Sequence, residues 1–278
     1  MSETREWQSQ TPVTRQEIAA DLRRIGLRPG DVVLVHSSLS RLGNVQGGAE
    51  AAVDALLDAA APSGTVLFPT LTGSERDGPD CPPIMDVRET SCVRWVGRIP
   101  EVARRRPDVV RSLHPTHSIS AIGPAAERYA AGHDQTATPC DERSPYVRLI
   151  QEGGWILLLG CDHESNTSLH CLEELAGVPY HLQAGWTDGV VVDRHGRRAT
   201  VRNRLHLWRW HRLFSRVDEP LEAAAAQVRG RVGLAEARLT RADRFAQCLL
   251  PILRADPLHL LHPDVRQEYL AEAVRSGA

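Results

Sequence analysis

The sequence predicts an α/β fold whose sheet is at least partly parallel. Continuous apolar runs occupy residues 31–36, 64–70 and 153–160, and short runs without polar alternation are typical of strands buried on both faces. Stretches of helical length separate these runs. The order strand, helix, strand over residues 31–70 indicates a β-α-β unit, which places its two strands parallel with a right-handed crossover.

The first half of the chain opens with a helix and continues through this unit. Thr14 and Glu17 form a capping box, and the helix that it starts closes near Gly26. The first strand ends on His36. The turn, helix and strand that follow are expected at residues 37–48, 49–61 and 64–70.

The middle of the chain begins with a long loop, residues 72–93, that is rich in proline and acidic residues and shows no periodicity. Long loops of this kind often cover a site. A helix is expected at about 96–106 and a strand within 111–122. The buried strand of residues 153–160 then leads through a polar turn into a helix that starts near Thr167.

Beyond residue 180 the pattern changes to two strand-like pieces, 189–193 and 198–202, about His195 and Gly196. This pattern predicts a hairpin. The remainder contains two alanine-rich helical stretches and shows no chemical constellation.

Composition excludes several classes of function. The 33 basic and 35 acidic residues give a formal charge of −2, so no overall field favours nucleic acid or an anionic membrane. All the basic residues are arginine, which excludes a lysine Schiff base, a lysine general base and a P-loop lysine. The polar start lacks the apolar region of a signal peptide, and no apolar run could span a membrane. The six cysteines have no C-x-x-C or zinc-type spacing, so we expect reduced thiols and a cytoplasmic protein.

The sharpest candidate site lies where the strand of residues 153–160 gives way to the next helix. If Thr167 begins that helix, His170 and Glu173 lie three residues apart on one face and can meet. The carboxylate would orient the imidazole and stabilise its protonated form, which is the pair that amine deprotonation requires. The same spacing is common among surface contacts, but ligands of open α/β sheets bind outside the carboxyl ends of strands.

Three weaker patterns accompany it. The glycine-bearing turn from His36 to Gly48 offers backbone amides and hydroxyls that suit a pyrophosphate, although it matches no nucleotide motif. His114 and His117 share one short segment, but a metal site would need further ligands, and buried histidines more often bond the backbone. Cys161, at a strand end, is a possible thiolate nucleophile.

Taken in order, several segments resemble the aminoglycoside 3-N-acetyltransferase family, whose fold differs from that of the GCN5-type acetyltransferases. The collinear matches are Val-His-Ser-Ser-Leu at 35–39 with Gly43 and 47–49, Gly-Thr at 64–65, Pro-Thr at 69–70, Arg-Ser-x-His-Pro at 111–115, Ser-Pro at 144–145, 157–160, and Asn-Thr-Ser-Leu-His-x-x-Glu at 166–173. The likeness covers roughly residues 14 to 250.

The resemblance implies one three-layer α/β/α domain over residues 1–278. We expect a mixed, partly parallel central sheet with an added C-terminal β-hairpin and helical part. The core should span about 14–250, and a helical extension should span 251–278. The resemblance implies acetyl-coenzyme A as cosubstrate, no metal and no covalent acetyl-enzyme. We expect a monomer or homodimer that binds a small-molecule amine.

The resemblance also assigns roles to residues. His170 would deprotonate the amine, Glu173 would orient His170, and Thr167 or a nearby amide would hold the oxyanion. His36 would polarise the thioester or shape the site. The residues expected along the coenzyme are His36, Ser37, Ser38, Leu39, Gly43, Val45, Phe68, Pro69, Thr70 and Ser118.

An aminoglycoside is polycationic, so its pocket should be acidic. The candidates are Asp77, Asp80, Asp86, Asp162, Glu164 and Glu174. His117 and His163 replace less basic residues of the family, and Cys171-Leu172 replaces its usual pair between His170 and Glu173, so the acceptor pocket is expected to differ. Three alternatives stay open: acetylation of another amine, a non-catalytic binder of aminoglycoside or coenzyme A, and a cysteine hydrolase that uses Cys161.

Overall fold

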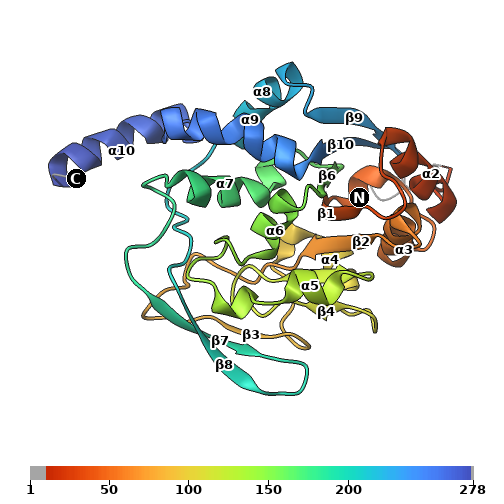
Figure 1. Ribbon diagram of the computed structural model, residues 1–278, viewed down its shortest axis with the longest axis horizontal. Coiled ribbons are helices and arrows are strands. Elements are labelled where there is room, and N and C mark those ends of the chain that lie inside the picture. The colour runs from red at the N-terminus through yellow and green to blue at the C-terminus, as the bar shows by residue number, and fades with distance from the viewer. Residues whose placement is uncertain (1–10, 277–278) are drawn as a thin grey trace, which may run out of the picture.

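The computed structural model describes residues 11–276, and the outermost residues of the predicted domain, 1–10 and 277–278, lie outside this range. Its centre is a seven-stranded sheet with the order β4-β5-β2-β1-β6-β10-β9 (Figure 1). The strands are β1 (Val32–Ser37), β2 (Thr65–Pro69), β4 (Val110–Arg111), β5 (Ile119–Ile122), β6 (Trp155–Leu159), β9 (Gln227–Val232) and β10 (Ala235–Arg241).

The sheet is mixed. β1 pairs in parallel with both β2 and β6, and the helix α3 (Gly48–Ala60) links β1 to β2 as the β-α-β unit requires. The outer strands all pair antiparallel, β5 and β4 at one edge and β10 and β9 at the other. The predicted mixed, partly parallel sheet is therefore confirmed.

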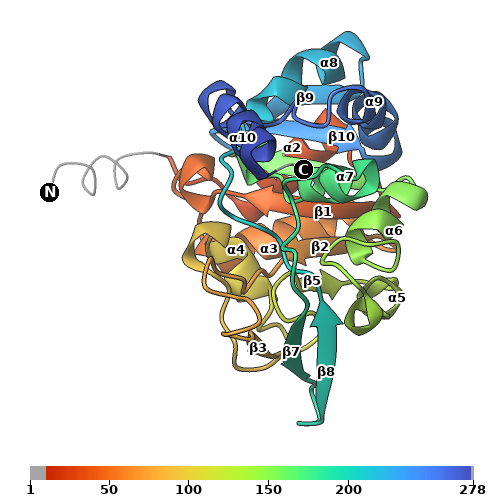
Figure 2. The same cartoon turned by 90° about the vertical axis from the view of Figure 1, so that its left-hand side faces the viewer.

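Helices cover both faces of the sheet, so the molecule has three layers (Figures 1 and 2). One face carries α2 (Arg15–Ile25), α3 (Gly48–Ala60) and α4 (Arg98–Ala103). The other carries α5 (Ala126–Ala130), α6 (Pro145–Gln151), α7 (Ser168–Ala176), α8 (Asp218–Ala223) and α9 (Ala242–Ala255). The last helix, α10 (Pro263–Ser276), carries the chain away from the sheet (Figure 1).

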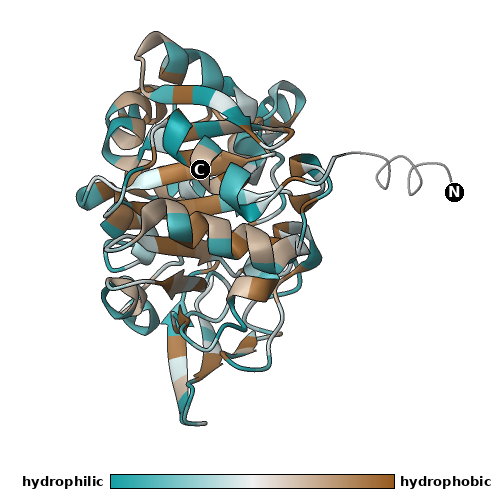
Figure 3. Ribbon diagram, turned by 90° about the vertical axis from the view of Figure 1, so that its right-hand side faces the viewer, coloured by the Kyte–Doolittle hydropathy of each residue, from teal (hydrophilic) through white to brown (hydrophobic). Residues whose placement is uncertain are grey.

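Alternation along the central strands explains their uninterrupted apolar sequences. In β1, Val33 and Val35 point into the core under α2 and α3, whereas Leu34 points into the core under the opposite helices. Because both faces are covered, every central position must be apolar. Figure 3 shows this as a concentration of hydrophobic residues along the middle strands.

A small second sheet lies beside the main one. It consists of β3 (Ile84–Asp86), β7 (Thr187–Val192) and β8 (Arg198–Asn203), and the β7–β8 hairpin projects from the body of the molecule (Figure 2). Asp193 closes its turn by accepting hydrogen bonds from the backbone amides of His195 and Arg197 at 2.8 and 2.9 Å. The hairpin predicted around His195 and Gly196 is thus present.

Other predicted elements hold or change for local reasons. The capping box forms, because Glu17 accepts from the Thr14 amide at 2.7 Å and Thr14 accepts from the Glu17 amide at 3.2 Å. The helix predicted at 96–106 shortens to α4, since Gly97, with φ of +94°, separates α4 from a preceding 3-10 turn. The strand predicted within 111–122 is split into β4 and β5 by a turn.

Two features of the fold differ from the expected element boundaries. The remainder of the chain, in which two alanine-rich helices were expected, also forms the β9–β10 hairpin, which completes the main sheet. The boundary expected at residue 250 falls inside α9, whose Leu249 and Leu253 both belong to the core. No helix among residues 11–276 has the length and apolar character needed to cross a bilayer.

Candidate active site

A cavity of about 320 Å³ lies at the carboxyl ends of the parallel strands. His36 and Ser37 come from the end of β1, Pro69 from the end of β2, and Thr167 and His170 from the start of α7. Clefts at this edge are the usual ligand sites of open α/β sheets. His170, the strongest candidate from the sequence, therefore lies at the edge of the sheet where ligands were expected to bind.

His170 and Glu173 form the predicted pair. His170 is half-buried and lines the cavity, and its Nδ1 lies 2.7 Å from Glu173 Oε2. Glu173 is fully buried, and its other oxygen accepts from Arg212 Nε at 3.2 Å. His181 Nδ1 lies 3.1 Å from Glu173 Oε2.

The electrostatics of this group favour a neutral imidazole beside an ionised carboxylate. Burial lowers the pKa of His170, and the hydrogen bond with Glu173 offsets this only in part. Burial alone would raise the pKa of Glu173, but the charges of His181 and Arg212 hold that pKa well below its usual value. With Nδ1 donating to Glu173, the other nitrogen of His170 is free to accept a proton.

His36 closes the floor of the cavity at the end of β1. Burial, together with the charges of His163 and His170, lowers the pKa of His36 to about 3. Its Nε2 is buried without a hydrogen-bond partner among the described residues. A neutral ring at this position can donate or accept one hydrogen bond to a ligand in the cavity.

Thr167 is the N-cap of α7 and lines the cavity beside His170. The helix begins at Ser168, as expected, and the amides of its first turn donate to Asn166 and to the Thr167 carbonyl. Helix N-termini favour developing negative charge.

The residues expected along the coenzyme divide into two groups. His36, Ser37 and Pro69 line the cavity. The others lie outside the lining: Ser38, Leu39, Gly43, Val45, Phe68, Thr70 and Ser118.

Four of the residues outside the lining have structural roles elsewhere in the fold. Phe68 and Val45 are buried in the core beneath α3. Thr70 and Ser118 are fully buried, and both hold Arg111, which donates to Ser118 Oγ at 3.1 Å and to the Thr70 carbonyl at 3.0 Å.

Of the six acidic candidates, Glu164 alone lines the cavity, and it also accepts from the Ser215 amide at 2.8 Å. Glu174 faces inward, where it accepts from His206 Nε2 at 2.7 Å and from the Cys140 amide at 3.1 Å. The remaining candidates lie away from the lining, and all but the exposed Asp80 make local contacts: Asp77, Asp80, Asp86 and Asp162.

The weaker sequence patterns also find their places. His114 Nδ1 accepts from the amides of Thr116 and His117 at 3.1 and 2.9 Å, which is the structural role of a buried histidine. His117 lines the cavity and stacks on Trp208. Cys161 lies outside the lining, and burial raises its pKa to about 11, so it is a thiol.

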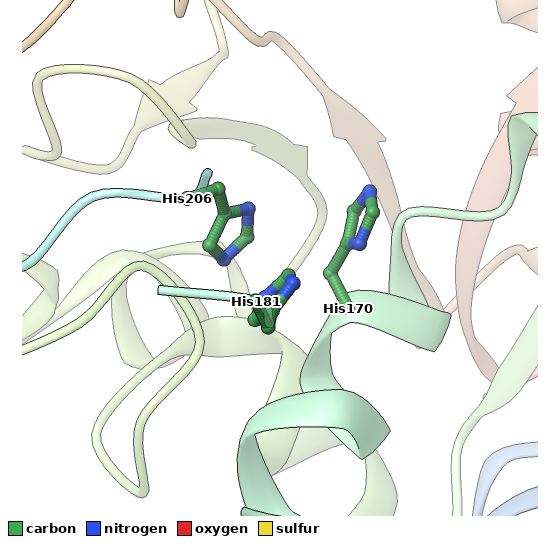
Figure 4. Close-up of side chains that lie close together, drawn as sticks. All are labelled: His170, His181 and His206. Atoms are coloured by element: carbon green, nitrogen blue, oxygen red, sulfur yellow. The ribbon is translucent and has the colours of Figure 1, made fainter. Parts of the chain in front are cut away.

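Several residues of the site come from the part of the chain that showed no chemical constellation. His181 and His206 approach His170 from two different loops (Figure 4). Arg212 anchors Glu173, and Trp208 packs edge-on against Trp95 at the cavity wall. The one signal in the sequence was the concentration of histidine, tryptophan and arginine at residues 206–212.

A histidine held by a buried carboxylate beside a cavity at the carboxyl edge of an α/β sheet is an arrangement typical of enzyme active sites. Residues 34–254 match a family model described as aminoglycoside 3-N-acetyltransferase. The chain belongs to this family and is an acyltransferase, as the resemblance in sequence predicted.

Individual relatives agree with this assignment. Aminoglycoside N(3)-acetyltransferase VII of Streptomyces paromomycinus is 36% identical over 201 residues, which cover 66% of this chain and 68% of that protein. Aminoglycoside N(3)-acetyltransferase IV of a Salmonella species is 32% identical over 252 residues, which cover 90% of each.

Solved structures are similar over almost the whole fold. The apoenzyme of aminoglycoside acetyltransferase AAC(3)-IVa has a TM-score of 0.77 and 29% identity, with 94% of this chain and 98% of that chain covered. AAC-IIIb in a binary complex with CoASH has a TM-score of 0.75 and 26% identity, covering 88% and 97%. AAC-VIa bound to sisomicin has a TM-score of 0.75 and 28% identity, covering 88% and 98%.

Proposed function

We propose that this protein transfers the acetyl group of acetyl-coenzyme A to the 3-amino group of an aminoglycoside, with His170 as the general base, and so confers resistance. The observation that carries the proposal is the His170–Glu173 pair at the cavity. A similar structure that contains CoASH supports the donor, and one that contains sisomicin supports the acceptor class.

The reaction follows from these positions. The amine attacks the thioester carbonyl, and His170 accepts the proton that the nitrogen must lose. Glu173 stabilises the resulting imidazolium, and Thr167, which lines the cavity, holds the oxyanion in this proposal. Collapse of the tetrahedral intermediate expels the coenzyme thiolate, which takes the proton from the His170 imidazolium and leaves as free coenzyme A, and the amide product remains.

Replacing the base tests the proposal. His170→Ala should lower kcat/KM by roughly 10²–10⁴ while the affinity for acetyl-coenzyme A changes little, because the imidazole acts on the amine. The measurements are thiol release for the rate and calorimetry for binding. His195→Ala, in the exposed hairpin, is the matched control. An undiminished rate in His170→Ala would show that another group is the base.

The alternatives give different results. A non-catalytic binder would release no thiol with any acceptor. A panel of gentamicin-like, kanamycin-like and non-sugar amines distinguishes the acceptor classes. Turnover with non-sugar amines alone would show that the acceptor is not an aminoglycoside. Cys161→Ser should keep full activity, since this thiol lies outside the cavity lining.

A further inference from the structure

His163 does not line the cavity, although it is one of the two histidines that replace less basic residues of the family. It begins the 3-10 turn His163–Ser165, which lies between β6 and α7. Its ring is buried and stacks on Phe245, with ring centres 6.2 Å apart and an angle of 10° between the planes. The same loop carries Glu164 and Thr167 to the cavity. Because buried polar groups are normally hydrogen-bonded, both ring nitrogens of His163 need partners within the protein.

One nitrogen of His163 holds the side chain that begins α7. Asn166 Oδ1 accepts a hydrogen bond from the backbone amide of Ser168, the first residue of the helix, at 3.1 Å. The nitrogen of the same side chain, Nδ2, therefore faces His163 Nδ1 at 3.2 Å and donates to it. Because a backbone amide can only donate, the direction of both hydrogen bonds is fixed, and His163 Nδ1 carries no proton.

The other nitrogen of His163 is held by β9, the edge strand of the main sheet. Gln227 Nε2 donates to Asp218 Oδ1 at 3.3 Å, so Gln227 Oε1 is the atom that faces His163 Nε2, at 2.8 Å. An amide oxygen can only accept, which places the ring proton on Nε2. Asp218 Oδ1, which accepts from Arg229 at 2.9 Å, also lies 3.7 Å from this nitrogen.

The two ends of this hydrogen-bond chain agree. The carboxylate of Asp218 at one end and the backbone amide of Ser168 at the other assign the same tautomer to His163. Burial lowers the pKa of His163, which keeps the ring neutral with a single proton. The chain therefore runs without a break or a reversed hydrogen bond from β9 to the first turn of α7.

The chain also leaves the side chain of Thr167 available. Thr167 occupies the N-cap position of α7, but its side chain makes no capping hydrogen bond. Asn166 supplies that bond instead, and asparagine is among the residues that cap helices most often. Thr167 lines the cavity together with His170, which lies three residues further along the helix.

We propose that His163 is a positioning residue for acetyl transfer, acting through Asn166 on the first turn of α7. The chain holds the Thr167 side chain and the His170 ring in place for the reaction. Misplacing a reacting group by about 1 Å can cost roughly 10²-fold in rate, so a residue outside the cavity can control the rate. The catalytic part rests on the proposed function, since it requires His170 to be the base. The hydrogen-bond chain itself does not depend on it.

Two substitutions of His163 separate its hydrogen bonds from its packing. His163→Phe keeps a ring against Phe245 but removes both hydrogen bonds, so kcat should fall by up to roughly 10²-fold. His163→Gln offers an oxygen to Asn166 and an N–H to Gln227, so it should restore most of the rate. Thiol release with both substrates saturating gives kcat. Calorimetry should show that the affinities for acetyl-coenzyme A and the amine change little.

A core substitution controls for loss of stability. Leu22→Ala, in the core on the opposite face of the sheet, should destabilise the fold and leave kcat unchanged. Urea unfolding compares its stability with that of His163→Phe, and circular dichroism checks that each variant is folded. An undiminished kcat in His163→Phe would overturn the proposal, and so would a loss of kcat that simply followed the loss of stability in both variants.

A double-mutant cycle tests whether Gln227 acts through His163. Gln227→Leu removes the outer link of the chain and should also lower kcat. The double variant with His163→Phe should be no slower than His163→Phe alone, because members of one hydrogen-bond network are not additive. Losses that multiply would show two independent effects and would contradict the chain.

Nitrogen-15 NMR tests the chain without any acetyl transfer. Near neutral pH, His163 Nδ1 should have the chemical shift of an unprotonated ring nitrogen and Nε2 that of a protonated one. The amide resonance of Ser168 should move in His163→Phe and stay in place in Leu22→Ala. The opposite tautomer, or an unmoved Ser168 resonance, would overturn the chain. If the unaltered protein acetylates no amine, the proposed function and the catalytic part of this proposal fail together, whereas the NMR measurement still decides the chain.

Discussion

The buried carboxylate of Glu173 is the centre of the site at the scale of single residues. An isolated buried charge costs several kcal/mol, and partners must compensate for it. Arg212 does so with a guanidinium that is itself fixed by the carbonyls of Leu207 and Trp210 at 3.1 and 2.7 Å. Glu173 therefore stays ionised and can stabilise the imidazolium that forms on His170.

The pH dependence of the rate should report this arrangement. His170 must be unprotonated to act, and burial lowers its pKa below the ordinary value of 6.5. A plot of kcat/KM against pH should therefore rise with a midpoint below pH 6.5 and then level off. Glu173 raises the pKa of His170, so Glu173→Gln should move the midpoint of this rise to lower pH and reduce the rate by roughly 10²–10⁴. Profiles between about pH 5 and pH 8 measure both effects. A midpoint that moved to higher pH in Glu173→Gln would contradict this electrostatic role.

Arg212 should matter for stability as well. Arg212→Gln leaves Glu173 buried with less compensation, and breaking a buried pair costs about 3–5 kcal/mol. The control is Arg209→Gln in the same segment, whose exposed ion pairs with Glu268 and Glu272 should contribute at most about 1 kcal/mol. Urea unfolding compares the two variants. Equal losses would mean that Arg212 does not compensate the buried charge.

At the scale of elements, β6 and the start of α7 place the base. Gly160 follows β6 with φ of +71°, and a Cβ there would lie 2.6 Å from Arg41 Cβ and 3.2 Å from the Ser38 carbonyl. The turn can thus pass close to β1 only because this residue has no side chain. Gly177 ends α7 with a nearly equal φ of +70°, but a Cβ at that position would meet no neighbouring segment within 4 Å.

These two glycines make a matched test. Gly177→Ala should cost about 1–2 kcal/mol, the strain of a left-handed residue. Gly160→Ala should cost about 1–3 kcal/mol more, because the same strain is joined by overpacking, and it should also slow transfer, because the Ser38 carbonyl that it crowds follows Ser37 in the cavity lining. Urea unfolding and thiol release are the measurements. Equal destabilisation by both changes would show that the close approach at Gly160 is unimportant.

The elements also show what a sequence can and cannot reveal. β1, β2 and β6 were predictable because covered strands must be apolar throughout, and the His170–Glu173 pair was predictable because its three-residue spacing is local. β9 and β10 were not, since their exposed arginines break the apolar pattern. His181 and Arg212 were equally hidden, because their contacts with Glu173 depend on how distant loops pack.

At the scale of the whole molecule, the interior contains an unusual concentration of histidine. Burial lowers the pKa of His36 to about 3 and that of His133 to about 4. Burial also lowers the pKa of His114, His117 and His206 well below the ordinary value. His181 is the exception, because burial would lower its pKa but Glu173 raises it.

This interior should make the protein sensitive to acid. Below pH 6.5 the unfolded chain binds protons that the buried rings reject, so the free energy of unfolding should fall as the pH drops from about 6.5 towards 4. His181 contributes in the opposite direction, because its contribution to the stability of the fold is lost as the pH rises through its raised pKa. The histidines with lowered pKa values are more numerous, so their effect should dominate. Urea unfolding across this range should show a slope that His133→Gln reduces and His195→Gln leaves unchanged. A flat profile would contradict the prediction.

The position of β10 has a consequence for synthesis of the chain. β6 pairs with β1 on one side and with β10 on the other, and the run Trp-Ile-Leu-Leu-Leu at Trp155–Leu159 is complete long before Ala235–Arg241 leaves the ribosome. During that interval the nascent chain presents an open, apolar strand edge, which is a template for pairing with other chains. Yield in the cell should therefore depend on how quickly translation delivers the last third of the protein, and on chaperones that cover this edge until it does.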